Sequence, residues 1–75
     1  NKGTAVIRLS KHLGIAIKNT IAFGDSMNDL EMLQTAGYSV CMGNGSKHLK
    51  NVANMVCPPV NQDGLYRAFM QLGLI

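Results

Sequence analysis

Residues 20–33 read TIAFGDSMNDLEML, and this stretch decides the fold of the chain. Its first four residues, Thr20 to Phe23, form an apolar run that is typical of a buried parallel strand. From residue 30 onward, apolar side chains recur at helical spacing. Asp25 and Asp29 therefore lie at a strand-to-helix turn, which is where open parallel sheets bind their ligands. The turn is predicted to be part of a Mg²⁺ and phosphate site.

The rest of the chain alternates helix and strand in the same way. Apolar periodicity predicts helices over residues 4–13, 27–35, 46–53 and 63–72, and strands over residues 20–23, 38–42 and 55–57. In the first helix, we expect the inner face to be Ala5, Leu9 and Leu13. This α-β-α-β-α-β-α order predicts an α/β fold with a parallel sheet and right-handed crossovers. Polar, glycine-containing segments follow all the strands and should converge at one edge of the sheet.

The composition is that of a small globular domain. With 75 residues and 47% hydrophobic residues, the chain is long enough for one small domain and too apolar to be disordered. Its net charge of +3 comes from scattered basic residues, which argues against nucleic-acid binding. No apolar stretch approaches the roughly 18–20 residues that span a membrane, and no secretory signal is recognised. Cys41 and Cys57 lack metal-ligand spacing and are interpreted as small buried hydrophobes of a cytoplasmic protein.

The acidic residues cluster, although the chain is basic. Three of the four acids, Asp25, Asp29 and Glu31, fall within seven residues, which indicates a cation site. Hard cations such as Mg²⁺ bind carboxylate oxygens and keep several waters, so one or two carboxylates suffice. The alternative is that Ser26 to Asp29 is only a helix capping box, which leaves Asp25 unexplained.

Two further residues are candidates for binding phosphate. Asn28 can donate to a phosphate oxygen at a helix N-terminus, and Lys2 can neutralise a phosphate as a point charge. Spacing alone also allows a simpler interpretation of each. Asn28 would then be a surface residue of a first turn, and Lys2 would be a frayed terminal side chain.

Taken in order, several blocks of this sequence resemble a known family. They cover nearly the whole chain: Lys2-Gly3-Thr4-Ala5, Leu13-Gly14-Ile15, Gly24-Asp25-Ser26-Met27-Asn28-Asp29, Met32-Leu33, Ala36-Gly37, Met42-Gly43-Asn44, Lys50, Ala53 and Asp63-Gly64. The pattern resembles the C-terminal part of the Cof-type phosphatases of the haloacid dehalogenase superfamily. The resemblance implies a three-layer, Rossmann-like α/β fold, of which residues 1–75 would be the C-terminal α-β-α-β-α-β-α portion.

The resemblance also implies a role for each candidate residue. Lys2 matches the lysine that stabilises the nucleophile and the transferring phosphoryl group. Asp25 matches the aspartate that coordinates Mg²⁺, and Asp29 matches a second aspartate that supports the metal, often through water. Asn28 matches an asparagine that contacts the phosphate or the metal's shell. The implied reaction is hydrolysis of a phosphate monoester through an aspartyl-phosphate.

The sequence departs from the family where the nucleophile should be. The family's DxDxT segment has no counterpart, and the cap domain that selects the substrate is missing too. We therefore expect this chain to belong to a larger Mg²⁺-dependent phosphatase and to be inactive alone. A fragment of a phosphomutase or of a sucrose-type phosphatase is an alternative, and so is a non-catalytic α/β binding or assembly module.

The same reasoning gives expectations about partners. The intact enzyme would act on a phosphorylated small molecule, such as a sugar phosphate, with no nucleic acid or membrane involved. In the family's fold, the strand that carries the nucleophile pairs beside Thr20 to Phe23. Without it, this strand would be an exposed apolar edge. We expect the chain to self-associate or to pair with a chain that carries the missing strands.

Overall fold

The computed structural model describes residues 1–73, apart from the side chains of Val60, Leu65 and Phe69. The helices are α1 (Lys2–Leu13), α2 (Leu30–Thr35), α3 (Lys47–Val52) and α4 (Gly64–Gln71), and the strands are β1 (Ile21–Gly24), β2 (Tyr38–Met42) and β3 (Met55–Cys57). Short 3₁₀ turns occur at Ile17–Asn19, Met27–Asp29 and Val60–Gln62. No helix within residues 1–73 is both long enough and apolar enough to cross a membrane.

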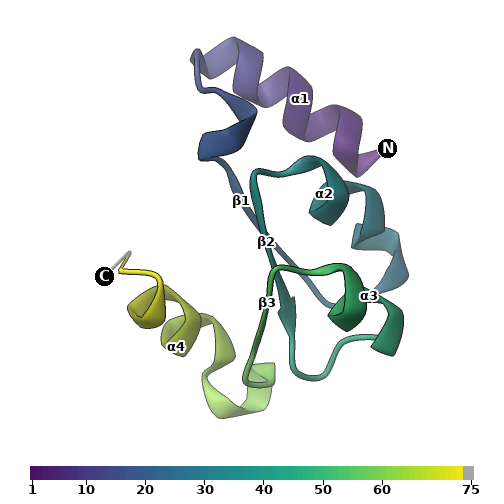
Figure 1. Ribbon diagram of the computed structural model, residues 1–75, viewed down its shortest axis with the longest axis vertical. Coiled ribbons are helices and arrows are strands. Elements are labelled where there is room, and N and C mark those ends of the chain that lie inside the picture. Colours follow the sequence, from purple (N-terminus) through teal and green to yellow (C-terminus); the bar gives the residue numbers. More distant parts are fainter. Residues whose placement is uncertain (74–75) are drawn as a thin grey trace.

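The strands form one parallel sheet in the order β1–β2–β3. Ile21 lies opposite Tyr38, and Val40 lies opposite Met55. Figure 1 shows α2 and α3 on one side of the strands and α4 on the other, so the sheet is the middle of three layers. The predicted three-layer, Rossmann-like α/β fold is therefore confirmed.

Each face of the sheet has its own apolar core. The core under α2 and α3 contains the buried residues Ala22, Leu33, Cys41 and Leu49. The core under α4 contains the buried residues Val40, Met42, Cys57 and Ala68. Because successive residues of a strand point to opposite faces, β2 supplies side chains to both cores.

The two cysteines lie in different cores and are free. Burial raises the pKa of both the Cys41 and the Cys57 thiol above the ordinary value. Both side chains are therefore neutral at physiological pH and pack as small apolar groups. Their interpretation as buried hydrophobes is confirmed.

The segment predicted as one helix over residues 27–35 has two parts. It begins as the 3₁₀ turn Met27–Asp29 and continues as α2. The carboxylate of Asp29 accepts hydrogen bonds from the backbone N–H groups of Asp25 and Ser26, just before the 3₁₀ turn. These bonds hold the start of the turn close to the end of β1. A 3₁₀ turn is a common form for such a helix start.

The predicted inner face of α1 is wrong. Leu9 and Leu13 were expected to be buried but are each 58% exposed, and the buried positions of α1 are Gly3 and Ser10. The reason is the close approach of α2. A Cβ atom on Gly3 would lie only 3.0 Å from the carbonyl oxygen of Glu31, so small residues occupy the contact and the large apolar ones lie outside it.

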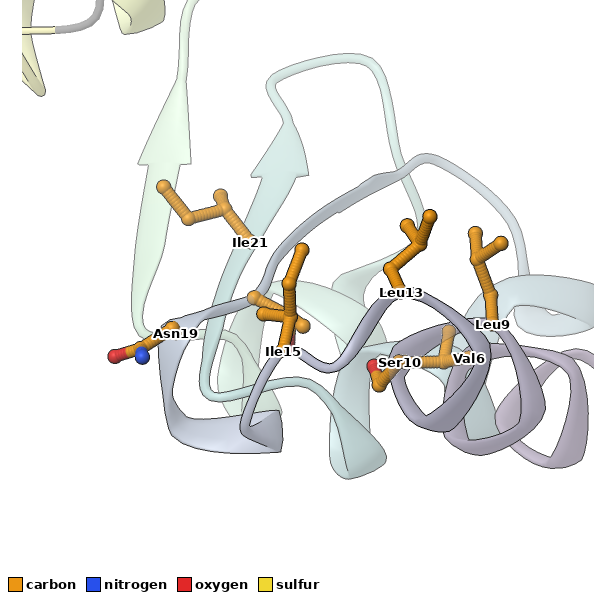
Figure 2. A pocket seen from close by; sticks show the side chains of 8 residues that line it. Val6, Leu9, Ser10, Leu13, Ile15, Asn19 and Ile21 are labelled. Carbon is orange, nitrogen blue, oxygen red and sulfur yellow. The ribbon is translucent and has the colours of Figure 1, made fainter.

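These outer apolar residues line a pocket beside β1. Its volume is about 310 Å³, and its walls include Val6, Leu9, Leu13, Ile15 and Ile21. Figure 2 shows Leu9 and Leu13 rising from α1 on the side where Ile15 and Ile21 lie. Ile21 is the first residue of β1, which pairs only with β2 in the part of the chain that the structure describes. As expected, β1 is an edge strand here, and its start is apolar and exposed.

Candidate metal and phosphate site

The turn after β1 is organised by the carboxylate of Asp29. Its Oδ2 atom accepts hydrogen bonds from the backbone N–H groups of Asp25 and Ser26, at 3.1 and 3.3 Å. Gly24 leaves room for this arrangement, because a Cβ atom at Gly24 would lie 2.7 Å from the Cβ of Asp29. The capping box predicted for Ser26 to Asp29 is present.

The other carboxylate oxygen of Asp29 binds a residue from a different helix. Oδ1 accepts a hydrogen bond from Nζ of Lys2, which lies 27 residues earlier, at the start of α1. Asp29 is 7% exposed, whereas the Lys2 side chain is 54% exposed. An ammonium group has three donors, so Lys2 can be held by Asp29 and still reach a ligand. The interpretation of Lys2 as a frayed terminal residue is wrong.

The surroundings of Asp29 keep its side chain ionised. The hydrogen bond from Lys2 has the largest effect and lowers the pKa of Asp29 below its ordinary value of 3.8. Burial acts in the opposite direction, but the backbone N–H groups of Asp25 and Ser26 and the charge of Lys2 lower the pKa further. At neutral pH, Asp29 is therefore a fixed negative charge that holds Lys2 in place.

Asp25 and Asn28 lie in the same turn, and both are exposed. The backbone of Asp25 is fixed from two sides. Its N–H group donates to Asp29, and its carbonyl oxygen accepts from the N–H group of Ser46 at 3.2 Å. Asp25 thus combines a fixed backbone with an exposed carboxylate, which is the chemistry that a hard cation requires.

The loops that follow the strands meet at one edge of the sheet, as predicted. The hydrogen bond from Ser46 to Asp25 joins the loop after β2 to the turn after β1. A Cβ atom on Gly43 would lie 2.8 Å from the carbonyl oxygen of Cys57 and 2.8 Å from Cδ of Pro59. The loop after β2 therefore also packs against the segment after β3. The turn with Asp25 and Asp29 lies at this common edge.

The two aspartates of the turn are not equivalent as metal ligands. Both oxygens of Asp29 already accept hydrogen bonds, whereas Asp25 is exposed. Among the described residues, no three His, Cys, Asp or Glu side chains lie close enough together to hold a metal ion. A single exposed carboxylate on a fixed turn still fits Mg²⁺, which takes one or two carboxylates and otherwise water or phosphate oxygens. The turn can therefore provide one part of a magnesium site.

Two polar residues outside the turn were missed in the sequence. Asn1 caps α1, with its Oδ1 accepting from the N–H of Thr4 at 2.9 Å, and the N-cap preference for Asn could have identified it. Asn54, just before β3, accepts from the N–H of Ser39 at 2.8 Å and from its hydroxyl at 3.1 Å. No local pattern connects Asn54 to Ser39, because they are 15 residues apart.

Comparison with known proteins agrees with this fold. A family model described as haloacid dehalogenase-like hydrolase matches residues 1–69. The chain belongs to the haloacid dehalogenase-like hydrolases. The resemblance seen in the sequence is therefore confirmed at the level of the family.

Individual relatives cover most or all of the chain. The putative phosphatase YkrA of Bacillus subtilis is 39% identical over 75 residues, which are 100% of this chain and 29% of YkrA. The 5-amino-6-(5-phospho-D-ribitylamino)uracil phosphatase YitU of the same bacterium is 42% identical over 67 residues, which are 89% of this chain and 25% of YitU. The solved structure of BT1666 from Bacteroides thetaiotaomicron, described among phosphatases of this superfamily, superposes with a TM-score of 0.94 at 34% identity.

The chain is short beside these hydrolases. The match to BT1666 covers 97% of this chain but 27% of that structure, and the shares of YkrA and YitU are 29% and 25%. The chain thus spans between a quarter and a third of the length of these three relatives.

Proposed function

We propose that this chain is the Mg²⁺- and phosphate-binding part of a phosphatase that hydrolyses phosphate monoesters through an aspartyl-phosphate. The observation that carries the proposal is the ion pair between Lys2 and Asp29, which fixes an ammonium group beside the turn that presents Asp25 and Asn28. Positive groups fixed in this way stabilise the charge on a transferring phosphoryl group. Membership of the hydrolase family and the phosphatase relatives support the same reaction.

Each residue of the site has its own role in this proposal. Asp25 is the direct ligand of Mg²⁺, because its carboxylate is exposed on a fixed turn. Asp29 supports the metal site indirectly, because both of its oxygens already accept hydrogen bonds, and it orients Lys2. Lys2 is the catalytic cation toward the phosphoryl oxygens, and Asn28 donates its amide to the phosphate. Bound Mg²⁺ would supply Lewis-acid stabilisation of the phosphoryl charge.

The 75-residue chain is proposed to be inactive by itself. The reaction needs a nucleophilic aspartate, and the acids of the chain are Asp25, Asp29, Glu31 and Asp63. Asp29 is buried and bound to Lys2, and Asp25 is assigned to the metal. Asp63 is followed by Gly64 and Leu65, so it does not begin the DxDxT segment that carries the nucleophile in the family. The nucleophile would therefore come from the rest of a longer protein, in agreement with the small shares of YkrA and YitU that the chain covers.

The substrate of the intact enzyme is proposed to be a phosphorylated small molecule, such as a sugar phosphate, in the cytoplasm. The name of the relative YitU specifies a phosphorylated ribityl compound, which supports this class of substrate. The free, buried cysteines suit a reducing compartment.

The open edge of β1 is proposed to pair with a further strand. In the isolated chain, a second copy would take this place. Exposed Ile21 and the apolar pocket next to it support the proposal, because an exposed apolar strand edge promotes pairing with another chain.

A magnesium titration tests the metal site without requiring catalysis. Adding MgCl₂ to the isotope-labelled chain should shift the backbone amide NMR resonances of Asp25 and Asn28. Asp25→Asn should abolish these shifts, and Glu31→Gln, which removes an exposed acid from the nearby helix α2, should retain them. Resonances of Asp25 and Asn28 that stay unchanged in the wild-type chain would contradict the proposed half-site.

An activity assay tests the missing nucleophile. The pure 75-residue chain, with Mg²⁺ and p-nitrophenyl phosphate, should show no turnover above background. Mg²⁺-dependent turnover that is lost in Asp25→Asn would show that the chain has a nucleophile of its own.

The coding sequence upstream of Asn1 gives a complementary test. A DxDxT segment there supports the enzyme, and its absence supports a non-catalytic binding module.

A further inference from the structure

Gly3 is buried in the first turn of α1, where there is little room for a side chain. A Cβ atom at this position would lie 2.7 Å from Oγ1 of Thr35 and 3.0 Å from the carbonyl oxygen of Glu31. Both atoms belong to α2, so the missing side chain sets how closely α1 and α2 approach each other. Gly3 is also the immediate neighbour of Lys2, whose ammonium binds Asp29 just before α2 begins.

We propose that Gly3 is a positioning residue: it lets α1 lie close enough to α2 for Lys2 to reach Asp29. The proposal rests on the proposed function, because it assigns Gly3 to the placement of the cation that faces the phosphoryl group. Gly3 itself touches no substrate. It acts through Lys2.

The neighbours of Gly3 cannot easily move aside. The Glu31 oxygen is part of the backbone of α2 and has no side-chain freedom. The Thr35 hydroxyl is held in place by its own hydrogen bond to the same Glu31 oxygen, at 2.7 Å. A methyl group on residue 3 would therefore press against two linked atoms, and we expect α1 and α2 to move slightly apart at this point. Lys2 and Asp29 lie at the adjoining ends of these helices, so the separation acts directly on their ion pair.

Helix propensity predicts the opposite effect for the same substitution. Alanine is a better helix former than glycine, so Gly3→Ala on an isolated helix would be neutral or stabilising. A loss of the Lys2–Asp29 contact in Gly3→Ala would thus come from the packing of α1 on α2.

The test measures the Lys2 ammonium group by NMR in the full 75-residue chain. In the wild type, the Lys2 Nζ resonance should be distinct from those of the other lysines and protected from exchange with water. In Gly3→Ala it should lose this distinct shift and protection and match exposed lysines such as Lys11 and Lys47. Lys2→Met identifies the resonance by removing it.

Two variants control for a general loss of structure. Ala5→Ser changes an exposed position of α1 by one small group and should leave the Lys2 resonance as in the wild type. Gly3→Ala combined with Thr35→Ala removes the nearest clashing atom, Oγ1, and should restore the resonance in part. A purely structural role for Gly3 would lower stability without this loss and partial return of the Lys2 signal.

A folded Gly3→Ala chain with a wild-type Lys2 resonance would overturn the proposal. If Gly3→Ala does not fold, Thr35→Leu adds bulk from α2 with Gly3 intact, and a wild-type Lys2 resonance in that variant would overturn it equally. None of these measurements uses Mg²⁺, phosphate or turnover. Titrating the same samples with inorganic phosphate tests the proposed function separately, so either idea can fail without the other.

Discussion

In the turn from Gly24 to Asp29, buried polar groups find their partners within the chain, whereas in the pocket between α1 and β1 large apolar side chains stay exposed. Among the described residues, no buried side-chain nitrogen or oxygen lacks a hydrogen-bond partner. In the pocket, Leu9 and Leu13 are each 58% exposed and Ile15 is 44% exposed. The turn is therefore organised by contacts within this chain, whereas the pocket leaves large apolar side chains exposed at the edge where we propose that a further strand pairs.

The largest effect on stability is expected when the Asp29 carboxylate, which organises the turn, is removed. Asp29→Ala leaves the N–H groups of Asp25 and Ser26 and the ammonium of Lys2 without their acceptor. It should lower the free energy of unfolding by about 1–3 kcal/mol, measured by urea unfolding. Glu31→Ala is the matched control, because Glu31 is an exposed acid and should change stability by no more than about 0.5 kcal/mol. Equal effects of the two substitutions would mean that Asp29 does not organise the turn.

A substitution at the start of β1 tests whether the exposed apolar edge beside the pocket pairs with another chain. Ile21→Lys places a charge on the exposed apolar edge and should weaken self-association about tenfold, which corresponds to about 1.4 kcal/mol. The measurement is light scattering over a range of concentrations. Val56→Lys is the control, because Val56 is an exposed residue of the other edge strand, β3. A wild-type chain that stays monomeric at high concentration, or a loss of association in both variants, would contradict pairing through β1.

The pH dependence of stability should report on Asp29. Its pKa is lowered in the folded chain from an ordinary value of 3.8, so its contribution is complete above that value and is lost as pH falls through the folded pKa. The difference in unfolding free energy between wild type and Asp29→Asn should be constant from pH 7 to 5 and should shrink below about pH 4. Urea unfolding at several pH values measures it, and a difference that grows on acidification would contradict the assignment.

The smallest effect on stability is expected at Asp25. Its carboxylate is exposed and only its backbone is held, so Asp25→Asn should change the free energy of unfolding by about 0.5 kcal/mol or less. Urea unfolding without Mg²⁺ checks this. A large loss of stability would mean that the Asp25 side chain contributes to the fold, and its role would then resemble that of Asp29.

Much of the fold could be predicted because local patterns determine it. The strands over residues 38–42 and 55–57 were predicted with the observed bounds, and Gly14 ends α1 with a positive φ of 70°, which glycine adopts readily. The capping function of Asp29 could also be predicted from the sequence, because it depends on the spacing of three residues between Ser26 and Asp29.

What could not be predicted depends on contacts between distant segments. The periodicity of α1 marks Leu9 and Leu13, but the contact with α2 uses Gly3 and Ser10, since close approach favours small residues over apolar ones. The Lys2–Asp29 pair likewise spans 27 residues, and the motif that includes Lys2 indicated its importance through resemblance rather than through spacing.

Because the two cysteines lie in opposite cores, the rates at which their thiols are modified report separately on the opening of each face of the sheet. Cys41 is 0% exposed under α2 and α3, and Cys57 is 3% exposed under α4. Since only an exposed thiolate reacts readily, a thiol reagent will modify each residue only when its own side of the sheet opens. The two labelling rates, resolved by peptide mass spectrometry, would therefore tell which helical layer lifts first.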